Sequence, residues 1–173
     1  MIELRKISIL DDNMPECIAL EVHPEQQNFV AENSYSLAEA YDNNKAYAEK
    51  GEGVIAVPYA VYENDKMVGF VMYGYFPPGD EDDDDPSEEY DMEEHFYYVW
   101  RLFVDKNHQG RGIGREVVRQ VMDEIKTKPY GPATHCYVSY EPTNVASQTT
   151  FRSYGFVEDG RVLEGETVAK YKI

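Results

Sequence analysis

The segment from Tyr97 to Ile125 constrains the fold of this chain more than any other, because a strand pattern, a glycine-rich loop and a helix pattern follow one another without a break. Residues 97–104 are aromatic or aliphatic apart from Arg101, which predicts a strand covered on both faces. From residue 113 onward, apolar residues recur at helical spacing and form one stripe. That stripe consists of Ile113, Val117, Val118, Val121, Met122 and Ile125.

The loop between these two elements favours an anion-binding site. Gly110, Gly112 and Gly114 allow close approach of the backbone to a ligand, and the first amides of the following helix have no partner within the helix. Arg111 and Arg115 add positive charge at the same place. The loop therefore predicts a diphosphate site, and the alternative is a tight strand-to-helix turn that binds nothing.

Two common phosphate motifs do not fit this loop. No lysine follows Gly114, which excludes the GxxxxGK[ST] phosphate loop, and the glycine spacing differs from the dinucleotide fingerprint GxGxxG. The sequence QGRGIG, preceded by a strand ending in LFVD, instead resembles the acetyl-CoA pyrophosphate loop of the GNAT superfamily of N-acetyltransferases.

The resemblance extends along most of the chain. The segments LEVHPEQQNFVAENSYSLAEAY (20–41), VGFVMYG (68–74) and VSYEPTN (138–144) are similar in order and spacing to bacterial spermidine/spermine-type acetyltransferases. It implies a GNAT-like α/β fold, with a mixed, mostly antiparallel sheet of about seven strands, a splayed parallel pair and about four helices.

The resemblance also implies acetyl-CoA as co-substrate and no metal. It places the pantetheine arm along Leu102, Phe103 and Val104, where strand amides would stabilise the oxyanion formed when an amine attacks the thioester. Asn144 would bond the same arm, although an asparagine before a helix is also a common N-cap. The remaining cofactor-binding residues that it implies are Gln109, Gly110, Arg111, Gly112, Ile113, Gly114 and Arg115.

The general acid departs from the family pattern. That pattern has a tyrosine seven residues after the asparagine, and this chain has Phe151 there. Tyr154, about one turn later, is the substitute candidate, and the competing interpretation is a core tyrosine whose hydroxyl reaches the surface. Because coenzyme A thiolate is a good leaving group near neutral pH, loss of such an acid need not abolish transfer.

The general base departs from the pattern too. Mammalian-type polyamine acetyltransferases carry an acidic residue where this chain has Trp100. The neighbouring Arg101 should face the opposite side of the sheet and needs a carboxylate partner if it is buried. The base candidates are Glu21, Glu25, Glu32 and His95. Each of them is also typical of a solvated surface.

Composition narrows the partners. A chain of 173 residues fits one domain, 1–173, and its net charge of −17 argues against nucleic acid or an anionic membrane and favours a cationic substrate. Eleven acidic residues fall between Asp80 and Glu94, inside an insertion at 77–95 that is either a solvated loop or an amine entrance.

Cys17 and Cys136 indicate neither a disulfide framework nor a zinc site, so we expect a cytoplasmic protein. A homodimer stays open.

The rest of the chain supplies the expected elements. Strands are predicted at 2–7, 54–62, 67–75, 134–140, 156–158 and 167–171, and helices from Met14, over 25–31, from a capping box at Ser36 and Glu39 to Lys50, and over 145–153. The leading hypothesis is an enzyme that acetylates a polyamine. The alternatives are a GNAT enzyme for another amine, such as an aminoglycoside or a protein or peptide amine, and a non-catalytic acyl-CoA-binding module.

Overall fold

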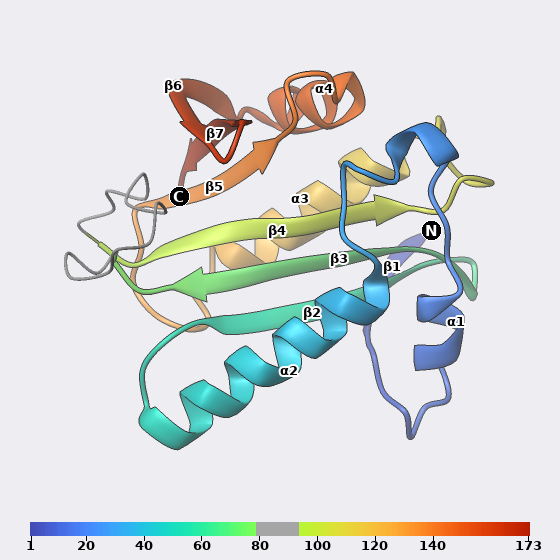
Figure 1. The fold of residues 1–173 in the computed structure, drawn as a ribbon, viewed down its shortest axis with the longest axis horizontal. Helices are drawn as coiled ribbons and strands as arrows, with labels where there is room; N and C mark the ends of the chain where they lie inside the picture. The colour runs from blue at the N-terminus through green and yellow to red at the C-terminus, as the bar shows by residue number, and fades with distance from the viewer. Residues whose placement is uncertain (79–93) are drawn as a thin grey trace.

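A single mixed sheet organises the computed structural model, which describes residues 1–78 and 94–173 (Figure 1). The strands run in the order β1-β2-β3-β4-β5-β7-β6, and only β4 and β5 pair in parallel. This architecture confirms the predicted fold class. The strand bounds are β1 Ile2–Lys6, β2 Ile55–Glu63, β3 Lys66–Phe76, β4 Phe96–Val104, β5 His135–Tyr140, β6 Val157–Leu163 and β7 Glu166–Lys172.

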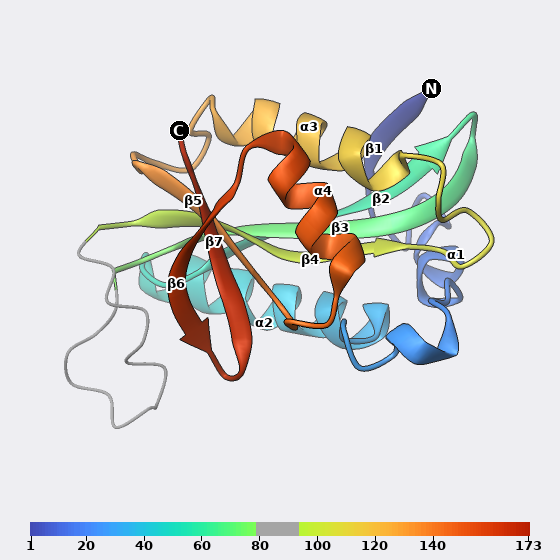
Figure 2. The same ribbon diagram turned by 90° about the horizontal axis from the view of Figure 1, so that it is seen from above.

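Helices cover the two faces of the sheet in separate pairs. Figure 2 shows α3 on one side of the sheet and α2 on the other. α3 contacts α4 and β4, whereas α1 packs with α2 against β2 and β3. The two faces are therefore called the α3 face and the α2 face below. The helix bounds are α1 Met14–Ile18, the 3₁₀ helix η1 Pro24–Gln26, α2 Asn33–Lys50, α3 Ile113–Ile125 and α4 Val145–Tyr154.

Two local predictions were wrong, one between α1 and α2 and one at the start of α2. The helix expected over 25–31 is only the 3₁₀ turn η1, which begins at Pro24. Ser36 is not a cap but lies buried inside α2, where its hydroxyl donates to the carbonyl of Glu32 at 3.2 Å. Polar side chains that bond one turn back can sit inside a helix, so the serine does not mark its start.

The parallel pair is short. Its register contains only Tyr97 opposite Cys136 and Tyr98 opposite Tyr137, although β4 continues to Val104 and β5 to Tyr140. Beyond Tyr98 the two strands separate, as Figure 1 shows. The sheet therefore has a V-shaped gap that opens toward the end of β4 from which the glycine-rich loop leaves.

The two edge strands are interrupted or covered. In β6, the register with β7 shifts between Glu158 and Val162, so the residues between them leave the regular ladder. At the other edge, the side chain of Gln120 on α3 donates to the carbonyl of Ile2 on β1 at 2.9 Å. Neither edge presents an uninterrupted row of free backbone groups.

Most of the acidic insertion predicted at 77–95 falls at residues 79–93, outside the described part of the chain, so its proposed role stays a prediction. Among the described residues, no helix has the length and apolar character needed to cross a membrane.

Candidate active site

The glycine-rich loop owes its shape to two left-handed residues. Gly110 has φ 75° and Gly112 has φ 79°, and Gly112 is the N-cap of α3. Space is not the reason for glycine, because a Cβ at either position would meet no atom within 4 Å. A side chain would instead strain the backbone by about 1–2 kcal/mol. The first amides of α3 consequently point out of the loop, in the arrangement that anions favour.

Gly114 differs from the other two glycines, because its φ is not left-handed. It lies in the first turn of α3, and an added Cβ would stand 3.7 Å from the methyl group of Thr150 on α4, an ordinary contact distance. An alanine would therefore fit at this position, and neither space nor backbone conformation requires a glycine there.

The two arginines beside the loop differ in availability. Arg111 is held by Glu63, at 2.8 Å, and approaches Nδ1 of His108 at 3.2 Å. Arg115 has no ion pair or hydrogen bond with any residue in the described ranges. It lines a hollow of about 390 Å³ together with Gly112, Glu116, Arg119, Ser153 and Tyr154. Only Arg115 is therefore free to meet a phosphate at the start of α3.

The side chain of Gln109 joins the glycine-rich loop to β4 and to η1 by hydrogen bonds. Its amide nitrogen donates to the carbonyl of Val104 at 2.9 Å and to Oε1 of Gln26 at 2.7 Å, while Gln26 donates back at 3.1 Å. This reciprocal amide pair joins η1 to the loop. The segment between α1 and α2 is thereby attached to the predicted diphosphate site.

Asp105 makes a second attachment of that segment. The Asp105 carboxylate accepts the backbone N–H of Glu21 at 3.2 Å and that of Asn107 at 3.0 Å. Burial works to raise the pKa of Asp105, but these amide donors outweigh burial and lower it. Lys106 adds an ion pair with Glu21. The turn after β4 is thus fixed in place before any ligand binds.

The open edge of β4 is the predicted place for the pantetheine arm. After Tyr98 no described residue of β5 pairs with β4, so the backbone groups on that edge have no ladder partner. Leu102 and Val104 pack toward the α3 face, and Phe103 packs among the residues of the α2 face. An extended ligand can pair with such an edge as an additional strand would.

A β-bulge changes the side-chain order within this edge. The register of β3 with β4 shifts so that Met72 faces Arg101 and Tyr73 faces Val99, which leaves Trp100 as the extra residue. Trp100 and Arg101 therefore lie on the same, α2 face, with the guanidinium 5.3 Å from the indole centroid. The expectation that they face opposite sides was wrong, because strict alternation fails at a bulge.

Arg101 does have the carboxylate partner that its burial requires. Its guanidinium lies 3.2 Å from Glu39 of α2, and both side chains are about one-fifth exposed. Burial raises the pKa of Glu39 in spite of the arginine.

Comparison with known proteins identifies this arrangement. The model of the acetyltransferase (GNAT) family matches residues 20–156. The chain belongs to this family. Acetyl-CoA is therefore its co-substrate, and the chain is an acetyl-CoA-dependent N-acetyltransferase. The free first-turn amides, the unpaired Arg115 and the open edge of β4 fit a ligand with phosphates at one end and an extended arm.

The individual relatives share a low sequence identity with this chain. The chain is 27% identical to a "Probable spermine N(1)-acetyltransferase" of Bacillus subtilis subsp. natto (strain BEST195) and 26% identical to a "Spermine/spermidine N(1)-acetyltransferase" of Bacillus subtilis (strain 168), with 93% of each chain covered. Among solved structures, the aminoglycoside acetyltransferase AAC(6')-Ib in complex with coenzyme A and kanamycin has a TM-score of 0.66 at 15% identity, with 99% of this chain and 95% of that chain covered. That structural likeness shows the shared fold.

Asn144 of this acetyltransferase is the N-cap of α4. Its Oδ1 accepts the backbone N–H of Ser147 at 3.1 Å. This is the structural interpretation of the residue, and it occupies only the oxygen of the side-chain amide. The amide nitrogen keeps two donors for another partner, and the predicted cofactor contact stays a prediction.

The two candidate positions for the acid lie apart. Phe151, where the family pattern has tyrosine, is buried between Tyr140 and Phe156. Tyr154 packs against Tyr171, and its hydroxyl accepts a hydrogen bond from Nζ of Lys126 at 2.7 Å. Lys126 follows the last turn of α3, roughly 20 Å along the helix from the glycine loop. Tyr154 also lines the hollow beside Gly112 and Arg115, but its hydroxyl is engaged by Lys126, so a structural role fits it better.

The four base candidates do not converge. Glu21 is paired with Lys106, and Glu25 and Glu32 are exposed. His95 stacks on Tyr75 at the paired end of β4, on the α3 face. Within residues 1–78 and 94–173, none of the four side chains forms a hydrogen bond, ion pair or ring contact with the open edge of β4.

The α2 face combines aromatic residues with two polar residues, Ser139 and Glu166, that sequence reasoning missed. Phe76 on β3 contacts Tyr98 and Trp100 of β4, with centroid distances of 5.7 Å and 5.3 Å. Beside this aromatic surface, Ser139 of β5 bonds both Tyr98 and Glu166 of β7. A serine near the end of β5 was the one visible signal. The position of Glu166 depends on the hairpin after α4, and no sequence pattern indicated that position.

Proposed function

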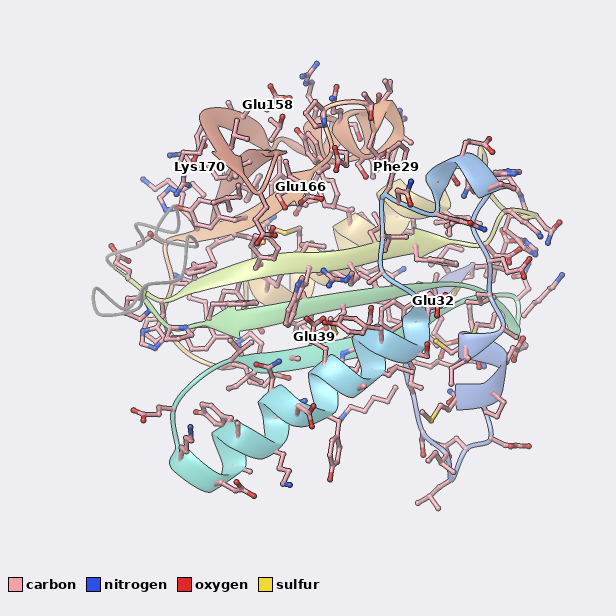
Figure 3. All side chains as sticks on the ribbon, in the orientation of Figure 1. Phe29, Glu32, Glu39, Glu158, Glu166 and Lys170 are labelled. Carbon is pink, nitrogen blue, oxygen red and sulfur yellow. The ribbon has the colours of Figure 1, made fainter. Side chains whose placement is uncertain are left out.

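We propose that this N-acetyltransferase moves acetyl from acetyl-CoA to a primary amino group of a polyamine such as spermidine or spermine. The carrying observation is the α2 face beside the gap, where Phe76, Tyr98 and Trp100 form an aromatic surface and Tyr98 is linked through Ser139 to the carboxylate of Glu166. Figure 3 shows Glu39 and Glu166 on the two sides of β4. Aromatic rings suit an alkylammonium chain, and carboxylates suit its charged ends.

Two further observations support the polyamine. The net charge of −17 attracts a substrate with several positive charges and repels anionic ones. The curated relatives, which are similar over 93% of the chain, are named for spermine or for spermine and spermidine.

The chain's own groups divide the reaction between the two faces. On the α3 face, the first-turn amides of α3 and Arg115 hold the phosphates, while the open edge of β4 orients the thioester supplied by acetyl-CoA. The amine approaches from the α2 face and attacks directly in a ternary complex. No covalent enzyme intermediate is needed, and burial raises the pKa of both Cys17 and Cys136, which makes their thiols poor nucleophiles.

A thiol-release assay with acetyl-CoA tests the substrate class. The panel should contain spermine, spermidine, putrescine, kanamycin and a lysine peptide at matched concentrations. We expect kcat/KM to be highest for spermine or spermidine. A preference for kanamycin would contradict the polyamine and favour an aminoglycoside, in line with the structural likeness, and a preference for the peptide would favour a protein amine.

A further inference from the structure

A chain of hydroxyl groups leads to a carboxylate at the narrow end of the gap. Tyr98 Oη lies 2.6 Å from Ser139 Oγ, and the Ser139 hydroxyl donates to Oε2 of Glu166. Because the Ser139 hydroxyl donates its only proton to Glu166, Tyr98 is the donor in the bond to Ser139. The three residues come from β4, β5 and β7 and share the α2 face.

Their position follows from the sheet register. Tyr98 is the last residue of β4 that pairs with β5, and Ser139 lies two residues past its partner Tyr137. The hydrogen bonds therefore cross the sheet where β4 and β5 begin to separate. Ser139 faces Val168 in the register with β7, so Glu166 projects on the same side, next to the gap.

The charge of Glu166 is not compensated by a cation. Glu39 pairs with Arg101 and Glu21 with Lys106, but within residues 1–78 and 94–173 no arginine, lysine or histidine forms an ion pair with Glu166. The residue is only half-buried, so the free carboxylate oxygen can be reached. Figure 3 shows Glu166 and Glu39 on opposite sides of β4, with Glu166 toward β5 and β7. An ammonium group of a substrate would supply the missing cation.

We propose that Glu166 is the proton acceptor for the attacking amine, with Ser139 and Tyr98 as positioning residues. The carboxylate takes one proton from the ammonium, so an N–H bond breaks and an O–H bond forms on Glu166. The freed electron pair then forms the N–C bond to the acetyl carbon, and the C–S bond breaks. The thiolate leaves with the sulfur electron pair, and the second proton of the nitrogen passes to it or to water.

This inference rests on the proposed function only in requiring a primary amine. A carboxylate can act on the ammonium of a polyamine, an aminoglycoside or a lysine in the same way. The experiment therefore uses whichever amine the wild-type enzyme acetylates best. Failure of the polyamine in the substrate panel would overturn the proposed function and leave the test of Glu166 intact.

The decisive variant is Glu166→Gln, assayed between pH 6 and pH 10. At neutral pH we expect kcat/KM for the amine to fall about 100-fold, the usual size of a lost acid–base contribution. The deficit should shrink as pH approaches the pKa of a primary amine, roughly 10, because the free amine needs no acceptor. Acetyl-CoA affinity, measured by calorimetry, should stay unchanged.

Matched variants separate this role from general charge. Glu164→Gln removes the same charge from the exposed turn of the same hairpin and should change kcat/KM less than threefold. Ser139→Ala keeps the carboxylate but removes its hydroxyl partner, so we expect a roughly tenfold loss and a shift of the acidic limb of the pH profile.

Three results would overturn the assignment. They are a Glu166→Gln deficit of similar size at every pH, a deficit of less than threefold at neutral pH, and a Ser139→Ala profile whose acidic limb coincides with that of wild type. If Glu166→Gln does not fold, Glu166→Asp takes its place, and a base role then requires partial activity with a displaced acidic limb.

Discussion

In the proposed function, the two faces of the sheet bind their ligands by different means. On the α3 face, the site consists mainly of backbone: two left-handed glycines, the first amides of α3 and an unpaired edge of β4. On the α2 face it consists of side chains: aromatic rings, the Arg101–Glu39 pair and the Glu166 carboxylate. The difference teaches that cofactor recognition depends on local conformation, whereas amine recognition depends on how distant segments meet.

Gly112→Val should have the largest effect on the α3 face. The branched side chain disfavours the left-handed backbone and stands where the phosphates approach, so we expect acetyl-CoA affinity to fall at least tenfold, about 1.4 kcal/mol. Gly51→Val is the matched control, since Gly51 has φ 76° and equally open surroundings at the end of α2. Calorimetry checks both variants. Equal affinities in wild type and Gly112→Val would remove the diphosphate site from this loop.

Asp105→Asn tests the attachment of the segment between α1 and α2 to the turn after β4. The lowered pKa of Asp105 means that its contribution to stability is present above its unfolded value of about 3.8 and is lost as pH falls through the lower folded value. We expect a loss of about 1 kcal/mol in the free energy of unfolding at pH 7, because an amide accepts fewer N–H groups. Urea denaturation should show the difference shrinking below pH 4. Asp42→Asn, on the exposed side of α2, is the control.

Two arginine variants test which side chain beside the glycine-rich loop binds a phosphate. Arg115→Ala should weaken acetyl-CoA binding about fivefold, because its guanidinium is free to meet a phosphate. Arg111→Ala should change the affinity less than twofold, since Arg111 is already held by Glu63. Added salt should narrow the gap between wild type and Arg115→Ala. The reverse ranking of the two variants would show that the Arg111–Glu63 pair breaks when the cofactor binds.

Tyr154→Phe should have the smallest effect. The hydroxyl bonds Lys126 beyond the end of α3, so we expect kcat to fall less than threefold with unchanged cofactor affinity. A fall of about 100-fold would instead establish Tyr154 as the general acid. Phe151→Tyr is then the informative companion, because it restores the residue of the family pattern at a buried position next to Tyr140.

The sequence was sufficient for the α3 face because its information is local. The periodicity from Ile113 to Ile125 predicted both ends of α3, and the glycines before it marked the turn. The parallel placement of β5 followed from the crossover helix between the strands. Each of these features is determined by residues within a few turns of one another.

The α2 face resisted prediction for equally physical reasons. The bulge at Trp100 reverses the alternation that places Arg101, and no residue type in the segment marks it. Glu39 is 62 residues from its partner Arg101, and Glu166 is 27 residues from Ser139. The choice of a base among many carboxylates depends on such long-range pairing, which composition and spacing do not contain.

The interrupted edges of the sheet bear on how the protein behaves at high concentration. Val157 and Val162 are exposed on β6, and a flat edge strand with two such side chains would be a template for adding a strand from another molecule. The shifted register between Glu158 and Val162 breaks that template, and Gln120 covers a carbonyl at the opposite edge. The enzyme can therefore expose an unpaired strand edge inside its gap, the proposed place for acetyl-CoA, while its outer edges resist aggregation.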